Sequence, residues 1–180
     1  QYFYYLNNLV HGDLGASFRY ADWSVNDLVA AALPVSLSIG GTAIVLSFFI
    51  GVILGIAAAL RQNSIADYTV MFVSNSGSVL PSFVMGPLLV LVFAILLKWL
   101  PAGGWDGFNW KFMLLPITLL TFINVATIAR VMRGSLIEVL HSNFIRTARA
   151  KGLPTRVVVF RHALKPALLP VVSVMGPLTI

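Results

Sequence analysis

The side chains best suited to acid–base or metal chemistry in this sequence are Glu138, His141 and His162. Glu138 and His141 are three residues apart, so they could share one face of a helix. His162 lies beyond Gly152 in a basic, water-facing stretch, and no His-Glu-x-x-His pattern falls within an apolar run. The chain has no cysteine, which excludes thiol catalysis and zinc–thiolate sites. We therefore expect no catalytic residue, no metal site and no bound cofactor.

Electrostatic binding is the second chemistry that the sequence offers, and it is concentrated in residues 142–170. This stretch has no acidic residue and holds half of the chain's 12 basic residues: Arg146, Arg149, Lys151, Arg156, Arg161 and Lys165. Small residues beside them would let a helix approach another surface closely, and a basic edge attracts an acidic one. The residues predict docking to a protein or to anionic lipid and favour neither.

Two short helices must position these basic side chains. Ser142 or Asn143 can accept hydrogen bonds from the free amides that open the first helix, and Gly152 can close it in the left-handed conformation. Pro154 suits the first turn of the second helix, where its missing N–H costs nothing. The sequence therefore predicts a helix, a glycine hinge and a second helix.

The composition of the chain is that of a membrane protein. Hydrophobic residues make up 58% of the chain and charged residues only 10%, whereas a soluble domain has roughly 25% charged residues. The net charge of +6 lies in short gaps between apolar runs, which indicates retention on the cytoplasmic side of a membrane and not nucleic-acid binding. We expect an all-α membrane protein with no nucleic-acid partner.

Long uncharged runs define the expected crossings, because about 20 apolar residues span a bilayer. We expect three complete spans at about residues 33–60, 68–97 and 112–129, and the start of a fourth from about residue 166. Residues 1–27 mix aromatic side chains with Asn, Gly and Asp, and should form a separate segment at the membrane surface, before a membrane domain over residues 28–180. Because the chain starts at Gln1 and ends in an apolar run, we expect a longer parent protein.

Polar residues and prolines interrupt the second span, as happens where a helix borders other helices or a water-filled cavity. Candidate lining residues of a pathway are Asn75, Ser78, Pro81 and Ser82, with Asn124 in the third span. The alternative is a kinked helix whose Ser hydroxyls bond to its own backbone. Gly51 and Gly55 form a GxxxG pair, which either permits close helix packing or reflects the abundance of glycine in membrane helices.

The distribution of charge predicts the orientation. Residues 130–165 carry eight Lys or Arg and a single acid, Glu138, and positively charged loops remain in the cytoplasm. Alternation then places residues 61–67 inside and residues 1–27 and 98–111 outside. The last of these contains three of the chain's four tryptophans, which prefer the level of the lipid headgroups.

The basic segment resembles the EAA motif of the membrane subunits of bacterial ABC importers, in which E-A-A is followed by three residues, Gly, nine residues and I-x-L-P. Ala148, Gly152 and Leu164 match this pattern, whereas Arg146, His162 and Lys165 depart from it. The sequence RTARAKG followed by RHAL is similar to the corresponding sequence in the dipeptide, oligopeptide and nickel branch of these membrane subunits. HGDLG at 11–15, SVNDL at 24–28, LPSF at 80–83 and RGSLIEVLHSNFIRTARAKGLP at 133–154 are similar to oligopeptide permeases of the B type.

This resemblance implies a helical bundle of the type I ABC importer kind in the bacterial inner membrane, with a cytoplasmic coupling segment at residues 130–165. Its partners would be a second homologous permease, two cytoplasmic ATPases and an extracytoplasmic peptide-binding protein. The chain has no GxxxxGK[ST] phosphate loop, so the ATPases would hydrolyse ATP. The implied ATPase-coupling residues are Asn143, Phe144, Arg146, Thr147, Ala148, Arg149, Ala150, Lys151, Gly152, Leu153 and Leu164.

The cargo implied by the resemblance is an oligopeptide, and dipeptides, nickel or another small solute are the alternatives within the same family. Few fixed charges and sparse hydrogen-bonding groups along the pathway suit peptides of varied sequence. A secondary transporter or channel is a further alternative, but such proteins use ionisable groups inside the membrane, and the three expected spans have none.

Overall fold

The computed structural model describes residues 2–178, apart from the side chain of Ser78. Its regular elements within that range are helices, and the one β interaction there is an isolated antiparallel bridge between Ala16 and Ser24. The chain divides into two compact units, residues 1–41 and residues 42–180. This confirms the all-α fold class predicted from the sequence.

The first unit contains helix α1 (Tyr2–Val10), a loop and the beginning of helix α2 (Val25–Leu60). The loop is closed by Asn26, whose amide nitrogen donates to the Gly12 carbonyl at 2.5 Å and whose amide oxygen accepts from the Leu14 N–H at 2.8 Å. Ser24 opens α2, because its hydroxyl oxygen accepts the Asp27 N–H at 3.1 Å and its own N–H donates to the Asp27 carboxylate at 3.3 Å. The loop after α1 is therefore ordered by local hydrogen bonds.

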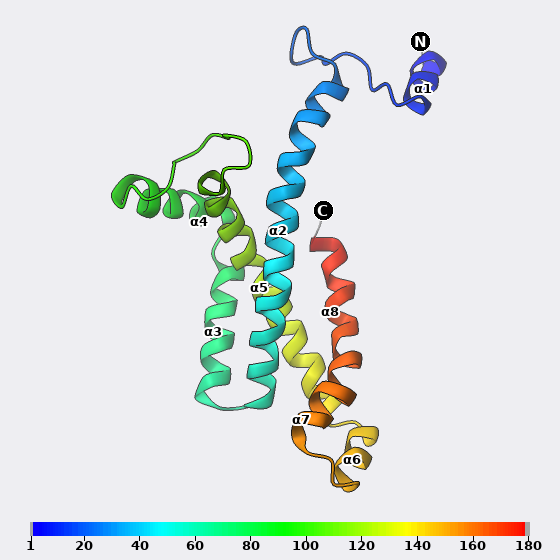
Figure 1. Ribbon diagram of the computed structural model, residues 1–180, viewed down its shortest axis with the longest axis vertical. Coiled ribbons are helices and arrows are strands. Elements are labelled where there is room, and N and C mark those ends of the chain that lie inside the picture. The colour runs from blue at the N-terminus through cyan, green and yellow to red at the C-terminus, as the bar shows by residue number, and fades with distance from the viewer. Residues whose placement is uncertain (1, 179–180) are drawn as a thin grey trace. The chain divides into compact units, whose positions relative to one another are not determined.

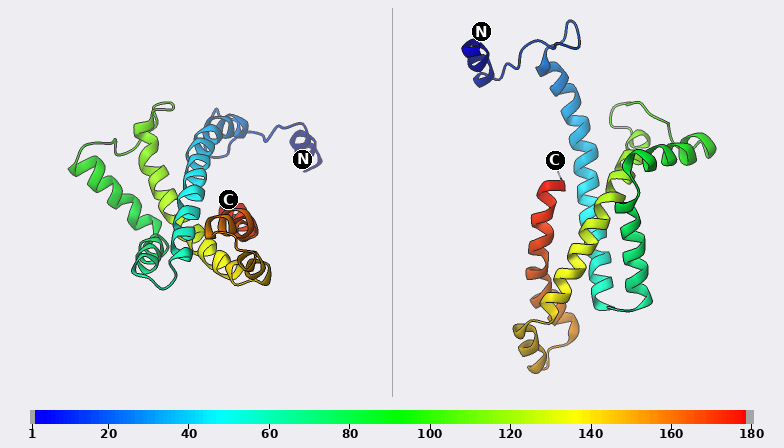
Figure 2. Two further views of the ribbon diagram at one scale, coloured as in Figure 1. Left: turned by 60° about the horizontal axis from the view of Figure 1, so that its bottom comes forward. Right: turned by 180° about the vertical axis from the view of Figure 1, so that it is seen from behind.

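Helix α5 (Trp110–Leu140) is the central element of the second unit. The Asn109 side chain caps its start by accepting the Lys111 N–H at 3.2 Å. Helix α3 (Ile65–Val79) and helix α8 (Leu164–Leu178) both pack against it, on opposite sides (Figure 1, Figure 2). Its fully buried residues Ile128, Met132 and Leu136 form the middle of the apolar core.

The glycine pair of α2 lies directly against α5. A Cβ atom at Gly51 would lie 2.7 Å from the Cγ2 atom of Ile128, and one at Gly55 would lie 2.7 Å from the Ala129 carbonyl oxygen. Both distances are shorter than any normal contact, so only glycine permits this approach of the two helices. The close-packing interpretation of the GxxxG pair is thereby confirmed over the alternative.

The polar second run differs from the continuous crossing expected at residues 68–97. Helix α3 stops at Val79, and helix α4 (Ser82–Leu89) continues into the π-helix η1 (Val90–Leu96) at an angle of 94° to α3. Leu80 has an extended backbone, with φ −79° and ψ 120°, directly before Pro81. A residue before proline is disfavoured in the helical region, and proline has no N–H to continue the helix, so the chain turns there.

The basic segment forms helix α6 (Asn143–Ala150), then the short helix α7 (Thr155–Val157) and the π-helix η2 (Val158–Ala163), which leads directly into α8. Within the described residues, three helical stretches are long and apolar enough to cross a membrane: Val25–Leu60, Trp110–Leu140 and Thr155–Leu178. The bent pair Ile65–Gly77 and Ser82–Leu96 adds a further, broken candidate. The helical stretch that contains the last expected crossing begins before residue 166, because α7, η2 and α8 are continuous.

Candidate functional site

Helix α6 begins and ends largely as its sequence predicts, with one difference at its start. Ser142 occupies the capping position, but its hydroxyl donates backwards to the Val139 carbonyl at 2.6 Å, and no side-chain hydrogen bond caps the free amides. The prediction that Ser142 or Asn143 accepts from those amides was therefore wrong for Ser142, and Asn143 is the first residue of the helix itself. The Ser142 hydroxyl is oriented by this local bond to the last turn of α5.

The glycine hinge has the predicted conformation. Gly152 has a φ of +78°, and its N–H donates to the Arg149 carbonyl at 2.9 Å, which closes α6. Pro154 follows at the capping position of α7 with an extended backbone and accepts the Val158 N–H at 3.1 Å, so it precedes the first turn that the sequence assigned to it. Gly152 in the left-handed conformation and Pro154 two residues later turn the chain back towards the long apolar helices.

One face of α6 is fixed to the core of the second unit. The Ile145 side chain is 0% exposed and Ala148 is 7% exposed, and both belong to the buried cluster that contains Met132 and Leu136 of α5 and Val158 of η2. The two residues are three positions apart, which places them on the same side of the helix. A displacement of α6 would therefore act directly on α5 and on the stretch that leads into α8.

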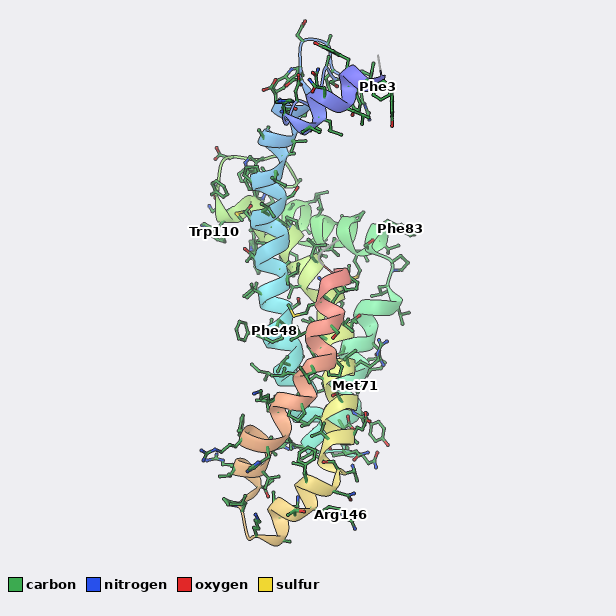
Figure 3. All side chains as sticks on the ribbon, turned by 90° about the vertical axis from the view of Figure 1, so that its right-hand side faces the viewer. Phe3, Phe48, Met71, Phe83, Trp110 and Arg146 are labelled. Carbon is green, nitrogen blue, oxygen red and sulfur yellow. The ribbon has the colours of Figure 1, made fainter. Side chains whose placement is uncertain are left out.

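The other face of α6 is open. The exposed residues of this helix and its exit are Asn143, Phe144, Arg146, Thr147, Arg149, Ala150, Lys151 and Gly152. Phe144 is 51% exposed although it is aromatic. Figure 3 shows Arg146 at the end of the second unit opposite Trp110. Within the described part of the chain, no carboxylate forms an ion pair with Arg146, Arg149 or Lys151, so the open face presents unpaired positive charge.

The eleven residues predicted to couple to an ATPase thus divide into two groups. Ala148 is buried, and Leu153 and Leu164 are partly buried and pack against the same apolar cluster. The remaining eight are exposed. The structure therefore gives the motif residues Ala148 and Leu164 a packing role inside this chain, while the residues between them form the accessible surface.

Asp67 and Arg133 form an ion pair that the sequence analysis did not identify. The Arg133 Nε and Nη2 atoms donate to the two carboxylate oxygens of Asp67, each at 2.6 Å, and Asp67 is 1% exposed. Asp67 also accepts the Asn63 N–H at 3.0 Å, and its own N–H donates to the Ser64 hydroxyl oxygen at 3.2 Å. The spacing of Ser64 and Asp67 before an apolar run is typical of a helix start, so the sequence could have indicated the position of Asp67 but not its partner. The ion pair joins the start of α3 to α5.

The five predicted pathway residues are placed on three elements and the bend between them. The Asn75 amide oxygen accepts from the Arg130 Nη2 atom at 2.9 Å, which ties α3 to α5 a second time. Pro81 and Ser82 are exposed at the bend, and Asn124 is partly buried on α5. The prediction for the Ser78 side chain lies outside the described residues. The structure gives a defined partner to Asn75 and leaves the lining role of all five as a prediction.

The residues considered for catalysis are not assembled into a site. No group of three or more His, Asp or Glu side chains among the described residues could hold a metal ion. The His141 Nδ1 atom donates to the Ile137 carbonyl at 2.7 Å, so this ring is attached to its own helix. The accessible chemistry of this region is therefore the positive charge of the basic segment.

Apolar helices of membrane length packed around α5, with a short basic helix fixed to their end, define a polytopic α-helical membrane protein. Within that class, residues 51–179 match the family described as the inner membrane component of binding-protein-dependent transport systems, and the chain belongs to this family.

Relatives of known name match almost the whole chain. It is 63% identical to the oligopeptide transport system permease protein OppB of Salmonella typhimurium and 61% identical to OppB of Escherichia coli K12, in each case over 98% of this chain and 58% of the relative. It is 41% identical to the dipeptide transport system permease protein DppB of Bacillus subtilis, over 99% of this chain and 57% of that protein. The chain thus spans somewhat more than half the length of these relatives.

Proposed function

We propose that this chain is part of the permease subunit of a bacterial oligopeptide importer of the ATP-binding-cassette type, located in the inner membrane. Relatives named as oligopeptide permeases share 61–63% of its residues, whereas a relative named as a dipeptide permease shares 41%. This difference favours oligopeptides as the cargo. Dipeptides are the second candidate, supported by the 41% relative.

The proposed assembly contains a second homologous permease subunit, two cytoplasmic ATPases and an extracytoplasmic peptide-binding protein. In this assembly residues 130–165 lie in the cytoplasm with residues 61–67, and residues 1–27 and 98–111 lie outside. The excess of Lys and Arg over acids in residues 130–165 supports this orientation. The chain itself would not hydrolyse ATP.

The observation that supports coupling is the two-sided environment of α6. Ile145 and Ala148 are buried among residues of α5 and η2, while Arg146, Thr147 and Ala150 are exposed on the same helix. A motor bound to the exposed face would move the buried face with it, because packed cores transmit displacement instead of absorbing it. Movement of α6 would then tilt α5 and α8 and alternate the pathway between its two openings.

The proposed pathway runs beside the polar part of α3 and the bend that follows it. Asn75, Ser82 and Asn124 offer hydrogen-bonding groups without fixed charge, with Ser78 and Pro81 as further candidates from the sequence. Such groups could contact the backbone of many peptides. Crosslinks from these positions to a transported peptide test the assignment, and uniform failure in a transporter that is turning over contradicts it.

Two tryptophan substitutions on α6 separate docking from folding. Ala150→Trp adds bulk to the exposed face, so we expect the ATPases to be lost from the purified full-length complex and peptide uptake to fall at least tenfold, with an unchanged melting temperature. Ala148→Trp adds bulk to the core, so we expect it also to destabilise the subunit by about 3 kcal/mol. Co-purification, uptake in proteoliposomes and thermal unfolding measure the three effects.

The matched control is Ala150→Ser, which keeps the exposed face small and should retain both the ATPases and uptake. If the Ala150→Trp variant retains the ATPases at normal yield and transports normally, α6 is not the docking helix.

A further inference from the structure

A cavity lies between the loop that joins α2 to α3 and the basic segment. Its volume is about 510 Å³, and its lining includes Arg61 and Ser64 from the loop, His141 at the end of α5, Arg149 of α6 and Thr155 of α7. These residues come from parts of the chain some eighty positions apart and meet only in the fold. The cavity is therefore not a property of the basic segment alone.

Positive charge converges on this cavity from two parts of the chain. Arg61 and Arg149 both contribute to the lining, and none of the described residues that line it is acidic. Across the described residues, neither arginine has a carboxylate partner, and Asp67, the acid close to this loop in sequence, is already held by Arg133. Two guanidinium groups thus face a common space with their hydrogen-bond donors available.

Neutral donors complete the surroundings. The Ser64 hydroxyl oxygen accepts the Asp67 N–H at 3.2 Å, which leaves its O–H free to donate. The His141 Nδ1–H donates to the Ile137 carbonyl at 2.7 Å, so the ring donor of this residue is already used within its own helix. Thr155 adds a second hydroxyl. Arginines with hydroxyl groups around one cavity match the several acceptor oxygens of a phosphate.

The rest of the lining indicates where the ligand comes from. Ala59 and Leu60 at the end of α2 and Leu140 at the end of α5 also line the cavity, so it lies where two apolar membrane-length helices stop. The span expected from the sequence ends at Leu60, so this end of α2 is expected at the level of the lipid headgroups. Arg149 also belongs to the open face of α6, but Arg146, Thr147 and Ala150 of that face do not line the cavity, so most of the open face stays accessible.

We propose that this cavity binds the phosphate group of an anionic phospholipid. The lipid would link the end of α2 to the basic segment and hold α6 at the membrane surface while its exposed face remains available. The cavity's location in the inner leaflet rests on the proposed orientation, whereas binding of the lipid phosphate does not.

Lipid titration of the purified full-length complex tests this proposal. Native mass spectrometry after delipidation would compare phosphatidylglycerol with phosphatidylcholine in the wild type and in the double variant Arg61→Gln, Arg149→Gln. One basic side chain near an anionic surface contributes a factor of about five, so we expect the double variant to bind phosphatidylglycerol roughly 25-fold more weakly. The wild type should prefer phosphatidylglycerol to phosphatidylcholine.

Two further variants control for folding and for net charge. Arg149→Lys keeps the charge and should retain most of the binding. Arg161→Gln removes one positive charge, where the double variant removes two, from an exposed residue of the basic segment that does not line the cavity, and should change the affinity by less than twofold. If the double variant and Arg161→Gln bind phosphatidylglycerol equally, the cavity is not the lipid site.

Two competition arms distinguish other occupants. Inorganic phosphate at 20 mM should leave phosphatidylglycerol bound; if it displaces the lipid completely, the ligand is a soluble anion and the proposal fails. Bound ATPases should also leave the lipid in place, and loss of the lipid when they bind would assign the cavity to the protein interface. Because lipid binding is measured without transport, failure here leaves the proposed transport function intact.

Discussion

The carboxylate of Asp67 is almost completely enclosed, and its free energy of burial is offset by two hydrogen bonds of 2.6 Å from Arg133. A buried charge is costly when it has no partner. Arg133 is less buried than Asp67, because 26% of its side chain is exposed, so its guanidinium group can reach water if the pair is broken. The two residues should therefore respond differently to substitution.

We expect Arg133→Gln to destabilise the full-length subunit by about 3 kcal/mol, because it leaves Asp67 buried without its cation. Asp67→Asn should cost roughly half as much, since the amide oxygen can still accept the Asn63 N–H and the exposed part of Arg133 is solvated. Thermal unfolding in detergent measures both. Glu138→Gln is the control, because Glu138 is exposed; equal losses for Asp67→Asn and Arg133→Gln would contradict the argument.

Helix α2 and helix α5 are held together by contacts that depend on the lack of a side chain. At Gly55 a Cβ atom would meet the Ala129 carbonyl oxygen and the Met132 Cβ atom, each at 2.7 Å. Neither group can move without displacing the helix, because one is backbone and the other is attached directly to it. At Gly134 of α5, in contrast, a Cβ atom would have nothing within 4 Å.

Gly55→Ala should therefore destabilise the subunit by roughly 1–3 kcal/mol through overpacking. Gly134→Ala is the matched control in a helix of the same unit and should be neutral or stabilise by up to about 1 kcal/mol, because alanine favours the helix more than glycine does. Thermal unfolding of the two full-length variants compares them directly. If Gly134→Ala loses stability and Gly55→Ala does not, the close approach of α2 to α5 at Gly55 is contradicted.

At the scale of the whole molecule, the orientation in the membrane decides whether α6 can meet a cytoplasmic motor. The chain has no cysteine, so single cysteines introduced in a cysteine-free full-length subunit report on accessibility. Gly103 lies in the loop between η1 and α5, and Lys151 lies at the exit of α6, and both are exposed. The two positions are expected on opposite sides of the membrane.

With a membrane-impermeant maleimide, Gly103→Cys should be labelled in intact spheroplasts, whereas Lys151→Cys should be labelled only after permeabilisation. The positive charge around Lys151 is the physical reason, because positively charged loops are not translocated. The cysteine-free parent should remain unlabelled in both conditions. Labelling of Lys151→Cys in sealed spheroplasts would invert the topology and remove α6 from the reach of the ATPases.

The sequence by itself determined the local features of this protein. Uncharged runs predicted the membrane-length helices, Gly152 predicted the end of α6, and Pro81 marked the place where the second run is interrupted. Each of these depends on chain length, hydrophobicity or backbone sterics over a few residues. The resemblance in the basic segment likewise needed only neighbouring residues.

The tertiary structure decided which residues meet. The pairing of Asp67 with Arg133, the contact of Gly55 with α5, the burial of Ala148 beneath α6 and the cavity between Arg61 and Arg149 all join distant parts of the chain. Periodicity shows that a helix has two faces, but which face a neighbour covers depends on how the helices pack. For that reason the sequence could only predict a docking helix at α6, and the fold separated its buried residues from its accessible ones.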